Sequence, residues 1–220
     1  MNTITLLRSR KLPPAFYERK NVCTVARELL GKTLVSYFDN ILTAGKIVET
    51  EAYNGSTDKA SHAWNGRRTE RTEIMYRHGG VAYVYLCYGI HHMFNVVTNV
   101  ADIPHAILVR ALEPVTGVEH MLVRTHKTKP DTSLTKGPGN VAKALGIHTR
   151  HTGTDLQSNH LFIADDGTRI SRSSILATPR IGVDYAGEDA LLPYRFVVKG
   201  NPYVSGKNGW QAGLVRISGN

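Results

Sequence analysis

Two glutamates, Glu49 and Glu51, stand two residues apart in an apolar stretch that ends at Tyr53. In an extended strand alternate side chains share a face, so both glutamates would lie beside Ile47 and Tyr53. A salt bridge at the rim of a sheet is the ordinary explanation for such carboxylates. A buried Glu51 would instead need a cation, which Arg110 in another apolar stretch could supply. A carboxylate held by an arginine in an aromatic pocket can orient and deprotonate a water molecule.

Tyrosines gather in the middle of the sequence, where four of the ten are Tyr76, Tyr83, Tyr85 and Tyr88. Tyr83 and Tyr85 are expected on one strand face, and Tyr88 stands before Gly89, where a turn can project its side chain. A strand that faces a core often has this pattern. The four arginines between residues 67 and 77 favour a second interpretation, in which the rings stack on bases or one ring inserts between them.

A glycine-rich turn, Gly137-Pro138-Gly139-Asn140, follows Lys136 and precedes a short helical segment. Its backbone N–H groups and the positive end of the helix could bind a phosphate. The Walker signature is missing, and a simple tight turn explains the sequence equally well.

Ten histidines raise the question of a metal site. The adjacent pair His91-His92 would face opposite sides of a strand, so both could not ligate one ion. The sequence contains neither an HExxH motif nor a Cys/His spacing typical of zinc, and we expect no metal site.

Hydrophobic periodicity predicts the elements that would position these residues. Helices are expected over 22–30, 67–75, 117–125 and 140–145, and strands over 33–38, 45–53, 81–87, 92–98, 106–113, 161–164, 174–177 and 194–198. Pro114 is expected to end the strand 106–113. The simplest architecture is a mixed α/β (α+β) single domain with mainly antiparallel strands over residues 15–205. A loose leader over 1–14 would precede it, and a tail over 206–220 would follow it.

The composition is that of a basic globular protein. The 220 residues include 27 Lys and Arg against 18 Asp and Glu, a formal net charge of +9, which attracts nucleic acid or an anionic membrane surface. Only two cysteines occur, Cys23 and Cys87, which excludes a disulfide scaffold and a cysteine-based zinc site. No apolar run is long enough to span a membrane, and residues 1–12 do not resemble a secretory signal, so we expect a cytosolic protein.

Several of these segments, taken in order, resemble the alkyladenine (3-methyladenine) DNA glycosylase family. The resemblance is carried by the run 47–53 with Asp58, Ala60 and His62, by Tyr83-Val84-Tyr85 with Tyr88-Gly89 and Asn95, by the run 108–114, by Gly137-Pro138, and by the run 180–183 with Ala186-Gly187. Their order and spacing agree from Phe16 to Ser205. Several separated motifs in register are far more specific than one short pattern.

The resemblance implies a base-excision-repair enzyme that flips damaged purines out of duplex DNA. Such an enzyme hydrolyses the N-glycosidic bond of 3-methyladenine, 7-methylguanine, hypoxanthine or ethenoadenine and leaves an abasic site. It is monofunctional, because water is the nucleophile and the strand is not cut. The resemblance also implies a curved sheet surrounded by short helices, no metal and no cofactor, and a monomer that binds double-stranded DNA in the cytoplasm or nucleus without a membrane.

The same resemblance implies roles for individual residues. Glu51 would be the general base that activates water, and Arg110 would position it. The flipped purine would be held by Tyr53, Ala60, His62, Tyr85 and Asn95, and Asn95 would exclude the amino group of guanine. Tyr88 would fill the gap left in the duplex, and further DNA contacts would come from Ile90, His91, Arg67, Lys136 and Gly137.

Two other functions stay open. A non-catalytic nucleic-acid binding module would keep the basic residues and tyrosines but would not need Glu51 paired with Arg110. An enzyme acting on carbohydrate could use Glu49 and Glu51 as paired carboxylates, although their backbones would be only ~7 Å apart. The loop 55–59 departs from the commoner family version, with Lys59 reversing a charge, which leaves the substrate range and the minor-groove contacts open.

Overall fold

Tight hairpins build the centre of the fold in the computed structural model, which describes residues 2–206. Strands β1 (Thr33–Phe38) and β2 (Ile41–Tyr53) are joined by Asp39 and Asn40. Both residues have positive φ, 53° and 62°, as a two-residue hairpin turn requires and as Asp and Asn tolerate. Strands β3 (Ala82–Cys87) and β4 (His91–Thr98) form a second hairpin, whose turn contains Tyr88 and Gly89, also at positive φ.

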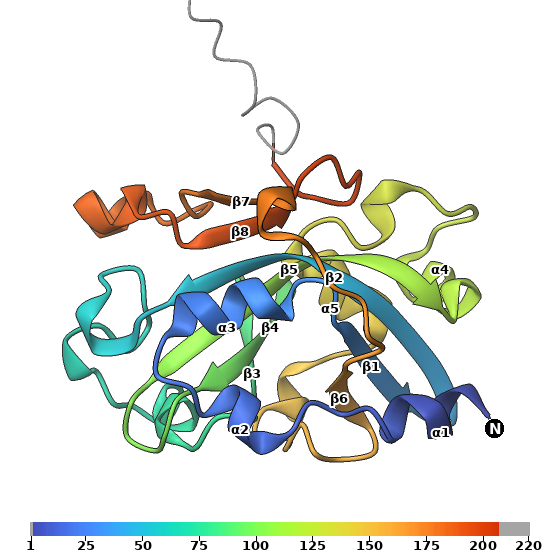
Figure 1. Cartoon of the computed structure of the whole chain (residues 1–220), viewed down its shortest axis with the longest axis horizontal. Coiled ribbons are helices and arrows are strands. Elements are labelled where there is room, and N and C mark those ends of the chain that lie inside the picture. The colour runs from blue at the N-terminus through green and yellow to red at the C-terminus, as the bar shows by residue number, and fades with distance from the viewer. Residues whose placement is uncertain (1, 207–220) are drawn as a thin grey trace, which may run out of the picture.

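The strands form an open, curved sheet in which every pairing between strands is antiparallel (Figure 1). Its main path runs β3-β4-β5-β2-β1-β6, with β5 at His105–Thr116 and β6 at Leu161–Ala164. Strand β8 (Arg195–Val198) pairs with both β2 and β7 (Ile175–Thr178). The predicted fold class, a mixed α/β single domain with a mainly antiparallel sheet, is confirmed.

Short helices surround this sheet. The α-helices are α1 (Thr3–Arg8), α2 (Pro14–Tyr17), α3 (Val22–Leu29), α4 (Val118–Thr125) and α5 (Pro138–Leu145). The 3₁₀ helices are η1 (Gly55–Thr57), η2 (Trp64–Gly66), η3 (Glu73–Tyr76), η4 (Thr132–Leu134), η5 (Thr149–His151), η6 (Arg172–Ser174) and η7 (Asp184–Leu191). Helix α3 buries Val25 and Leu29 in the main core, and the side chain of Asn21 accepts a hydrogen bond from Thr24 N at its start.

Two of the three register shifts between β2 and β5 decide which of their side chains meet around Glu49. Ile47 pairs with Leu112 and Glu49 with Ala111, so Val48 is an extra residue on β2. The next pair joins Thr50 to Val109, so Arg110 is an extra residue on β5. Ile47 therefore packs in the main core, whereas Val48 packs with Ala111 and Val197 on the opposite face. The prediction that Ile47 shares a face with Glu49 is wrong, because strict alternation fails at a bulge.

The N-terminal segment also differs from the loose leader predicted over 1–14. Ile4 of α1 packs with Val35 and Phe162, so this helix is docked on β1 and β6. Leu12 is buried, and its N–H donates to the carbonyl of Ile163. Residues 2–14 are therefore an ordered part of the fold, held by apolar burial and backbone hydrogen bonds.

Two further local predictions are corrected. In the segment 67–75, where a short helix was expected, helical structure begins only at Glu73 and continues to Tyr76 as a 3₁₀ helix. Strand β5 continues past Pro114 to Thr116. Strand β4 pairs with β5 only as far as Leu108, and the chain at Thr135 and Lys136 meets the same edge at Leu112 and Ala111. Among residues 2–206 no named strand pairs with this edge at Pro114, where a proline is tolerated.

At the C-terminal end, residues 207–220 of the predicted tail lie outside the described residues. Within residues 2–206, no helix combines the length and apolar character needed to cross a membrane.

Candidate active site

A cavity of about 290 Å³ opens beside the β3-β4 hairpin, over the middle of β5 and the end of β2. It brings together all five residues that the sequence marked for holding a purine, namely Tyr53, Ala60, His62, Tyr85 and Asn95. Arg110 and Tyr88 also line it. Residues that are far apart in the sequence, between positions 53 and 185, thus line one cavity. A concave site of this kind is the usual form of a small-molecule site.

The register of the sheet explains how the site residues meet. Tyr83 lies opposite Asn95, Asn95 opposite Leu108, and Leu108 opposite Glu51. Directly opposed residues on neighbouring strands point to the same face, so this row crosses β3, β4, β5 and β2 on one side of the sheet. A fifth strand, β8, continues the row, because Arg195 lies opposite Glu51.

The aromatic wall of the cavity is held by its own contacts. The rings of His62 and Tyr85 are 4.7 Å apart between centroids and meet edge to face at 76°. His62 Nδ1 lies 2.8 Å from the hydroxyl of Tyr83. Burial lowers the pKa of His62 to about 4, and the positive charges of Arg71 and Arg67 act in the same direction. The His62 ring is therefore neutral at neutral pH.

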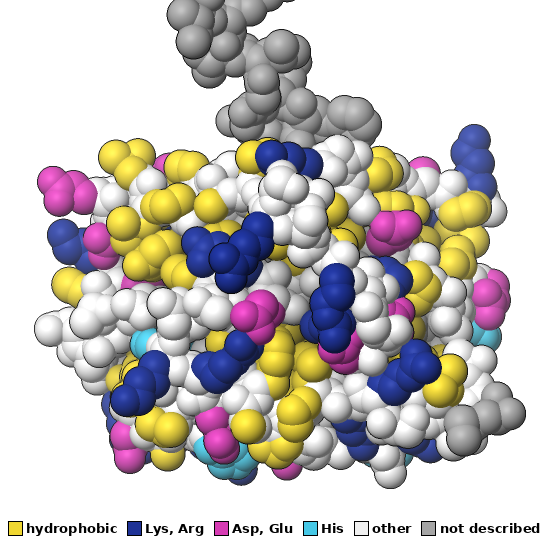
Figure 2. All heavy atoms as spheres, viewed as in Figure 1, with side chains coloured by type: hydrophobic (Ala, Val, Ile, Leu, Met, Phe, Trp, Pro, Cys, Tyr) yellow, Lys and Arg dark blue, Asp and Glu magenta, His cyan; other side chains and the backbone are white. Residues whose placement is uncertain are grey.

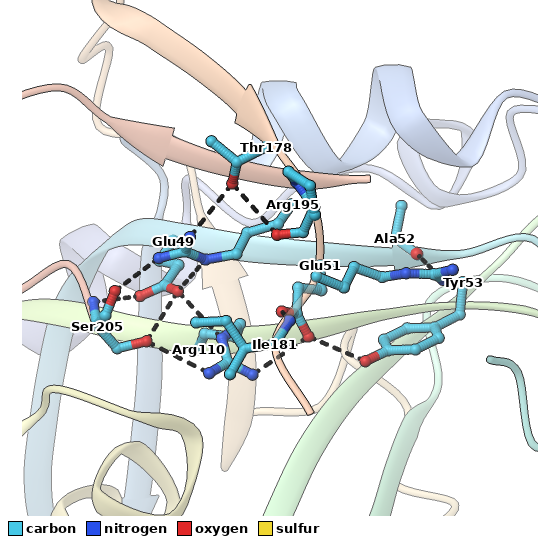
Figure 3. Close-up of polar contacts among 11 residues, drawn as sticks. Glu49, Glu51, Ala52, Tyr53, Arg110, Thr178, Ile181, Arg195 and Ser205 are labelled. Atoms are coloured by element: carbon cyan, nitrogen blue, oxygen red, sulfur yellow. Dashed lines mark hydrogen bonds and ion pairs between the residues drawn. The ribbon is translucent and has the colours of Figure 1, made fainter. Parts of the chain in front are cut away.

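Glu51 is fully buried (0 % exposed), and its carboxylate lies beside Tyr53, Arg110 and Ile181 (Figure 3). One carboxylate oxygen accepts hydrogen bonds from the Tyr53 hydroxyl at 2.9 Å and from Arg110 Nη1 at 3.2 Å. The other oxygen accepts from the backbone N–H of Ile181 at 2.8 Å. All three donor residues line the cavity, whereas Glu51 is not among its lining residues.

The two side chains that touch Glu51 keep their protons. Burial, together with the negative charge of Glu51, raises the pKa of the Tyr53 hydroxyl well above its usual value. Burial disfavours the charged form of Arg110, but Glu51 and Glu49 outweigh it and raise the pKa of the guanidinium. Tyr53 therefore donates as a phenol and Arg110 as a cation, and the contact expected between Glu51 and Arg110 is present.

Glu49 is the residue whose surroundings the sequence did not reveal. Its carboxylate accepts hydrogen bonds from Arg110 Nε at 3.0 Å and Arg195 Nε at 2.7 Å, and from both the N–H and the hydroxyl of Ser205 (Figure 3). With its oxygens occupied in this way, Glu49 is poorly placed to act as a second catalytic acid beside Glu51. This geometry speaks against the carbohydrate-enzyme hypothesis.

A buried ion pair joins two walls of the cavity. Arg180 donates to both carboxylate oxygens of Asp58, with Nη2 2.8 Å from Oδ1, and also to the carbonyl of Ala52. Its guanidinium lies 4.8 Å from the centre of the Tyr53 ring. Arg180 thus fastens the loop that follows β2 to the segment that supplies Ile181.

The residues expected to contact DNA lie around the mouth of the cavity and beyond it. Tyr88 (92 % exposed) and Ile90 (71 % exposed) project from the β3-β4 turn. Ile90 and His91 line a groove together with Gly139 and Lys143 of α5, while Pro138 at the start of α5 reaches the cavity itself.

Basic residues do not gather into one patch on the face shown in Figure 2, where they alternate with acidic and apolar side chains. Arg67 lines a second groove with Lys59, Arg71 and His62, next to the cavity. Lys136 forms a β-bridge with Ala111, and Gly137 after it has a φ of 94° that favours glycine. The predicted phosphate contacts are therefore spread over several elements.

Several residues that line the cavity had no role in the sequence analysis. They are Ser61, Met75, Cys87, Met93, Ala106, Leu108, Ile181, Gly182, Val183 and Tyr185. Three of them, Ile181, Gly182 and Val183, belong to the run 180–183 that carried part of the family resemblance. Tyr185, whose hydroxyl donates to the carbonyl of Ala60, lies in an irregular 3₁₀ segment without a sequence pattern that marks it.

Across residues 2–206 the structure brings together no group of three or more His, Cys, Asp or Glu side chains able to hold a metal ion.

Comparison with known proteins adds an independent observation. A family model described as methylpurine-DNA glycosylase matches residues 15–202. A protein of Bacillus cereus (strain G9842) named "Putative 3-methyladenine DNA glycosylase" is 47 % identical over 203 residues, which cover 89 % of this chain and 98 % of the relative. Proteins with the same name from Bacillus thuringiensis (strain Al Hakam) and Bacillus mycoides (strain KBAB4) are each 46 % identical over 203 and 201 residues. These alignments cover 89 % and 88 % of this chain and 98 % of each relative.

Proposed function

The chain belongs to the methylpurine-DNA glycosylase family, and from this premise we propose that it removes alkylated or deaminated purines from duplex DNA. Activity of the 3-methyladenine type on DNA follows from the family and from the names of the relatives. The finer proposal is that the damaged purine is flipped into the cavity and that a water molecule, activated by Glu51, hydrolyses its N-glycosidic bond.

The buried carboxylate of Glu51 behind an aromatic cavity is the observation that carries this proposal. When the C–N bond breaks, its electron pair leaves with the purine and positive charge develops on the sugar. The negative Glu51 would stabilise that charge and accept a proton from the attacking water, whose oxygen bonds to the anomeric carbon. A water that replaces one of the present donors, such as the Tyr53 hydroxyl, would be oriented by Glu51 and Arg110 together.

The cavity walls suit a flat, electron-poor base. Tyr53, Tyr85 and His62 offer aromatic surfaces, and a cationic methylpurine is attracted to the electron-rich faces of tyrosine rings. Methylation that creates this cation also makes the base a good leaving group. Because His62 is neutral, it adds no positive charge against such a base.

Asn95 supplies a means of excluding guanine. Its Nδ2 donates to the backbone carbonyls of Tyr83 at 3.1 Å and Met93 at 3.0 Å, and the residue is buried. Because two hydrogen bonds hold the amide, it cannot swing aside to make room for an additional amino group on the base. We propose that normal guanine is rejected by this rigidity.

The mouth of the cavity suits a duplex from which one nucleotide has been extruded. Tyr88 lies at the tip of the β3-β4 hairpin and points to solvent. Inserted into the duplex, its ring would occupy the space vacated by the flipped base and stack on the neighbouring pairs. Arg67, Lys136, Gly137, Ile90 and His91 would supply further DNA contacts, of which those to phosphates weaken as the salt concentration rises.

The proposal is tested with duplexes that each carry one lesion: 3-methyladenine, 7-methylguanine, hypoxanthine or ethenoadenine. The wild-type protein should release the free base from at least one duplex and leave a strand that breaks only after alkali. Glu51→Gln should release little, whereas Glu113→Gln, which removes an exposed carboxylate from β5, should match the wild type. Binding without base release by the wild type would favour a non-catalytic binding module, and strand cleavage without alkali would contradict the monofunctional reaction.

A further inference from the structure

A cluster of buried polar side chains adjoins Glu51. Glu49, Arg110, Arg195 and Ser205 come from β2, β5, β8 and the chain that follows β8, and all four are buried. Glu49 and Arg195 have less than 5 % of their side chains exposed. Ser205 is the last residue of the domain predicted from the sequence, and the family match ends at residue 202. The proposed reaction assigns no role to Glu49, Arg195 or Ser205.

The contacts of Arg110 divide its guanidinium among three partners. Nε donates to Glu49 at 3.0 Å, Nη2 donates to the Ser205 hydroxyl at 3.3 Å, and Nη1 donates to Glu51 at 3.2 Å. A guanidinium is planar and rigid, so fixing two of its nitrogens fixes the third. Glu49 and Ser205 thus determine where Nη1 lies relative to Glu51.

Ser205 is itself held from several directions. Its N–H donates to one oxygen of Glu49 at 2.6 Å, and its hydroxyl donates to the other at 2.8 Å. Its carbonyl accepts from Arg195 Nη2 at 2.6 Å, and the neighbouring Val204 packs with Val48 and Val197. The hydroxyl therefore has a defined direction, with its proton toward Glu49 and its lone pairs toward Arg110.

Charge is balanced within this group. Glu49 and Glu51 carry two negative charges, and Arg110 and Arg195 carry two positive charges. Arg195 donates to Glu49, so Arg110 does not have to neutralise Glu49 alone and one of its nitrogens is left for Glu51. Buried ions are stable only when they are matched and hydrogen-bonded in this way.

We propose that Glu49 and Ser205 are positioning residues of the glycosylase reaction: by holding Nε and Nη2 of Arg110, they fix Nη1 against Glu51. The inference rests on the proposed function, because it assigns the cluster a task in that reaction. It does not make either residue catalytic, since both act through Arg110.

Ser205→Ala is the sharpest test, because it removes one hydroxyl and leaves the backbone contacts of residue 205 in place. Excision of a single lesion is measured with enzyme in saturating excess over duplex, and affinity for the same duplex is measured separately. We expect the excision rate to fall roughly tenfold, since small errors in orientation are costly in a reaction centre. Affinity should stay unchanged. Ser36→Ala, which removes another buried hydroxyl on β1, should keep the wild-type rate.

A double-mutant cycle separates positioning from a general loss of stability. Lysine at position 110 has no planar guanidinium for Ser205 to orient, so Ser205→Ala should change the rate less than about twofold in an Arg110→Lys background. A tenfold loss in both backgrounds would show that Ser205 acts independently of Arg110 and would overturn the proposal. Equal rates for Ser205→Ala and wild type would overturn it as well.

Glu49→Gln extends the test to the carboxylate. It should lower the rate more than Ser205→Ala, because it removes the charge that opposes two arginines and places an amide N–H₂ where an acceptor is needed. This variant can fail to fold, which is why Ser205→Ala carries the decision. A wild-type protein without glycosylase activity would refute the proposed function itself. An active wild type, an inactive Glu51→Gln and a fully active Ser205→Ala would refute only the positioning role.

Discussion

The floor of the cavity and its mouth differ in how their side chains are held. At the floor, Glu51 and Arg110 are buried, and each meets several partners at hydrogen-bonding distance. At the mouth, Tyr88 and Ile90 are among the most exposed apolar side chains of residues 2–206. One region is organised before any ligand arrives, and the other exposes apolar surface that only a ligand would cover.

This difference separates the effects expected from mutation. Changes at the floor remove partners from buried charges, so they should lower both stability and the rate of excision. Changes at the mouth truncate side chains that are exposed to solvent. They should therefore lower affinity for DNA and leave the stability of the fold unchanged. Each of the following variants tests whether its region behaves in this way.

Arg110→Met should have the largest effect. It removes the cation shared by two buried carboxylates while keeping an unbranched apolar side chain of comparable length. We expect the free energy of unfolding to fall by about 3–5 kcal/mol and the excision rate to fall with it. Urea denaturation measures the first effect. A loss below about 1 kcal/mol, the value typical of an exposed pair, would mean that the floor is not organised as described.

Tyr88→Ser should weaken binding without affecting the fold. Loss of one stacking ring should reduce affinity for a lesion-containing duplex by about 1–3 kcal/mol, while the excision rate at saturating enzyme changes much less. Fluorescence anisotropy of a labelled duplex measures the affinity. Val123→Ser, a substitution of an apolar side chain on α4 that is 74 % exposed, is the matched control. Equal affinity of Tyr88→Ser and wild type would refute the insertion role.

His62→Gln should have the smallest effect on stability, which appears only at acidic pH. The pKa of His62 is about 4 in the folded protein, below its ordinary value of 6.5. Between pH 6.5 and 4 the His62 ring is therefore protonated in the unfolded chain but neutral in the folded protein. Because the unfolded chain binds this extra proton, the free energy of unfolding falls as the pH falls from 6.5 toward 4. The variant should lose less stability over that window in urea denaturation. Other histidines with lowered pKa, such as His151, contribute equally to both proteins.

An identical loss of stability in His62→Gln and wild type would show that the His62 ring is not shielded from solvent in the cavity wall. The smaller loss that we expect would show that burial in this wall keeps the ring neutral.

The parts of the site that the sequence predicted follow from simple alternation. Tyr83 and Tyr85 were expected on one strand face, and their rings lie 5.5 Å apart on one wall. A buried Glu51 needs a cation, and the sequence offered Arg110 as that partner. Arg110 Nη1 lies 3.2 Å from a carboxylate oxygen of Glu51. The strands themselves were predicted within a few residues, because their apolar runs end at glycine, asparagine or aspartate turns.

The parts that could not be predicted depend on tertiary structure. The bulges at Val48 and Arg110 break the alternation, and nothing in the local sequence fixes their position. Ser205 gains its contacts only when the chain after β8 returns to β2, so its place beside Glu49 has no local signal. The ordering of residues 2–14 also depends on distant partners, since Ile4 packs with Phe162.

The most direct test of the account is to measure excision and affinity together for Glu51→Gln on one lesion-containing duplex. With saturating enzyme, the account predicts that the excision rate falls roughly a hundredfold to ten-thousandfold, the range contributed by a positioned base. Affinity for the duplex should remain close to that of wild type, because the mouth of the cavity is intact. An undiminished rate, or an affinity lost in parallel with the rate, would contradict the claim that Glu51 at the buried floor performs the chemistry.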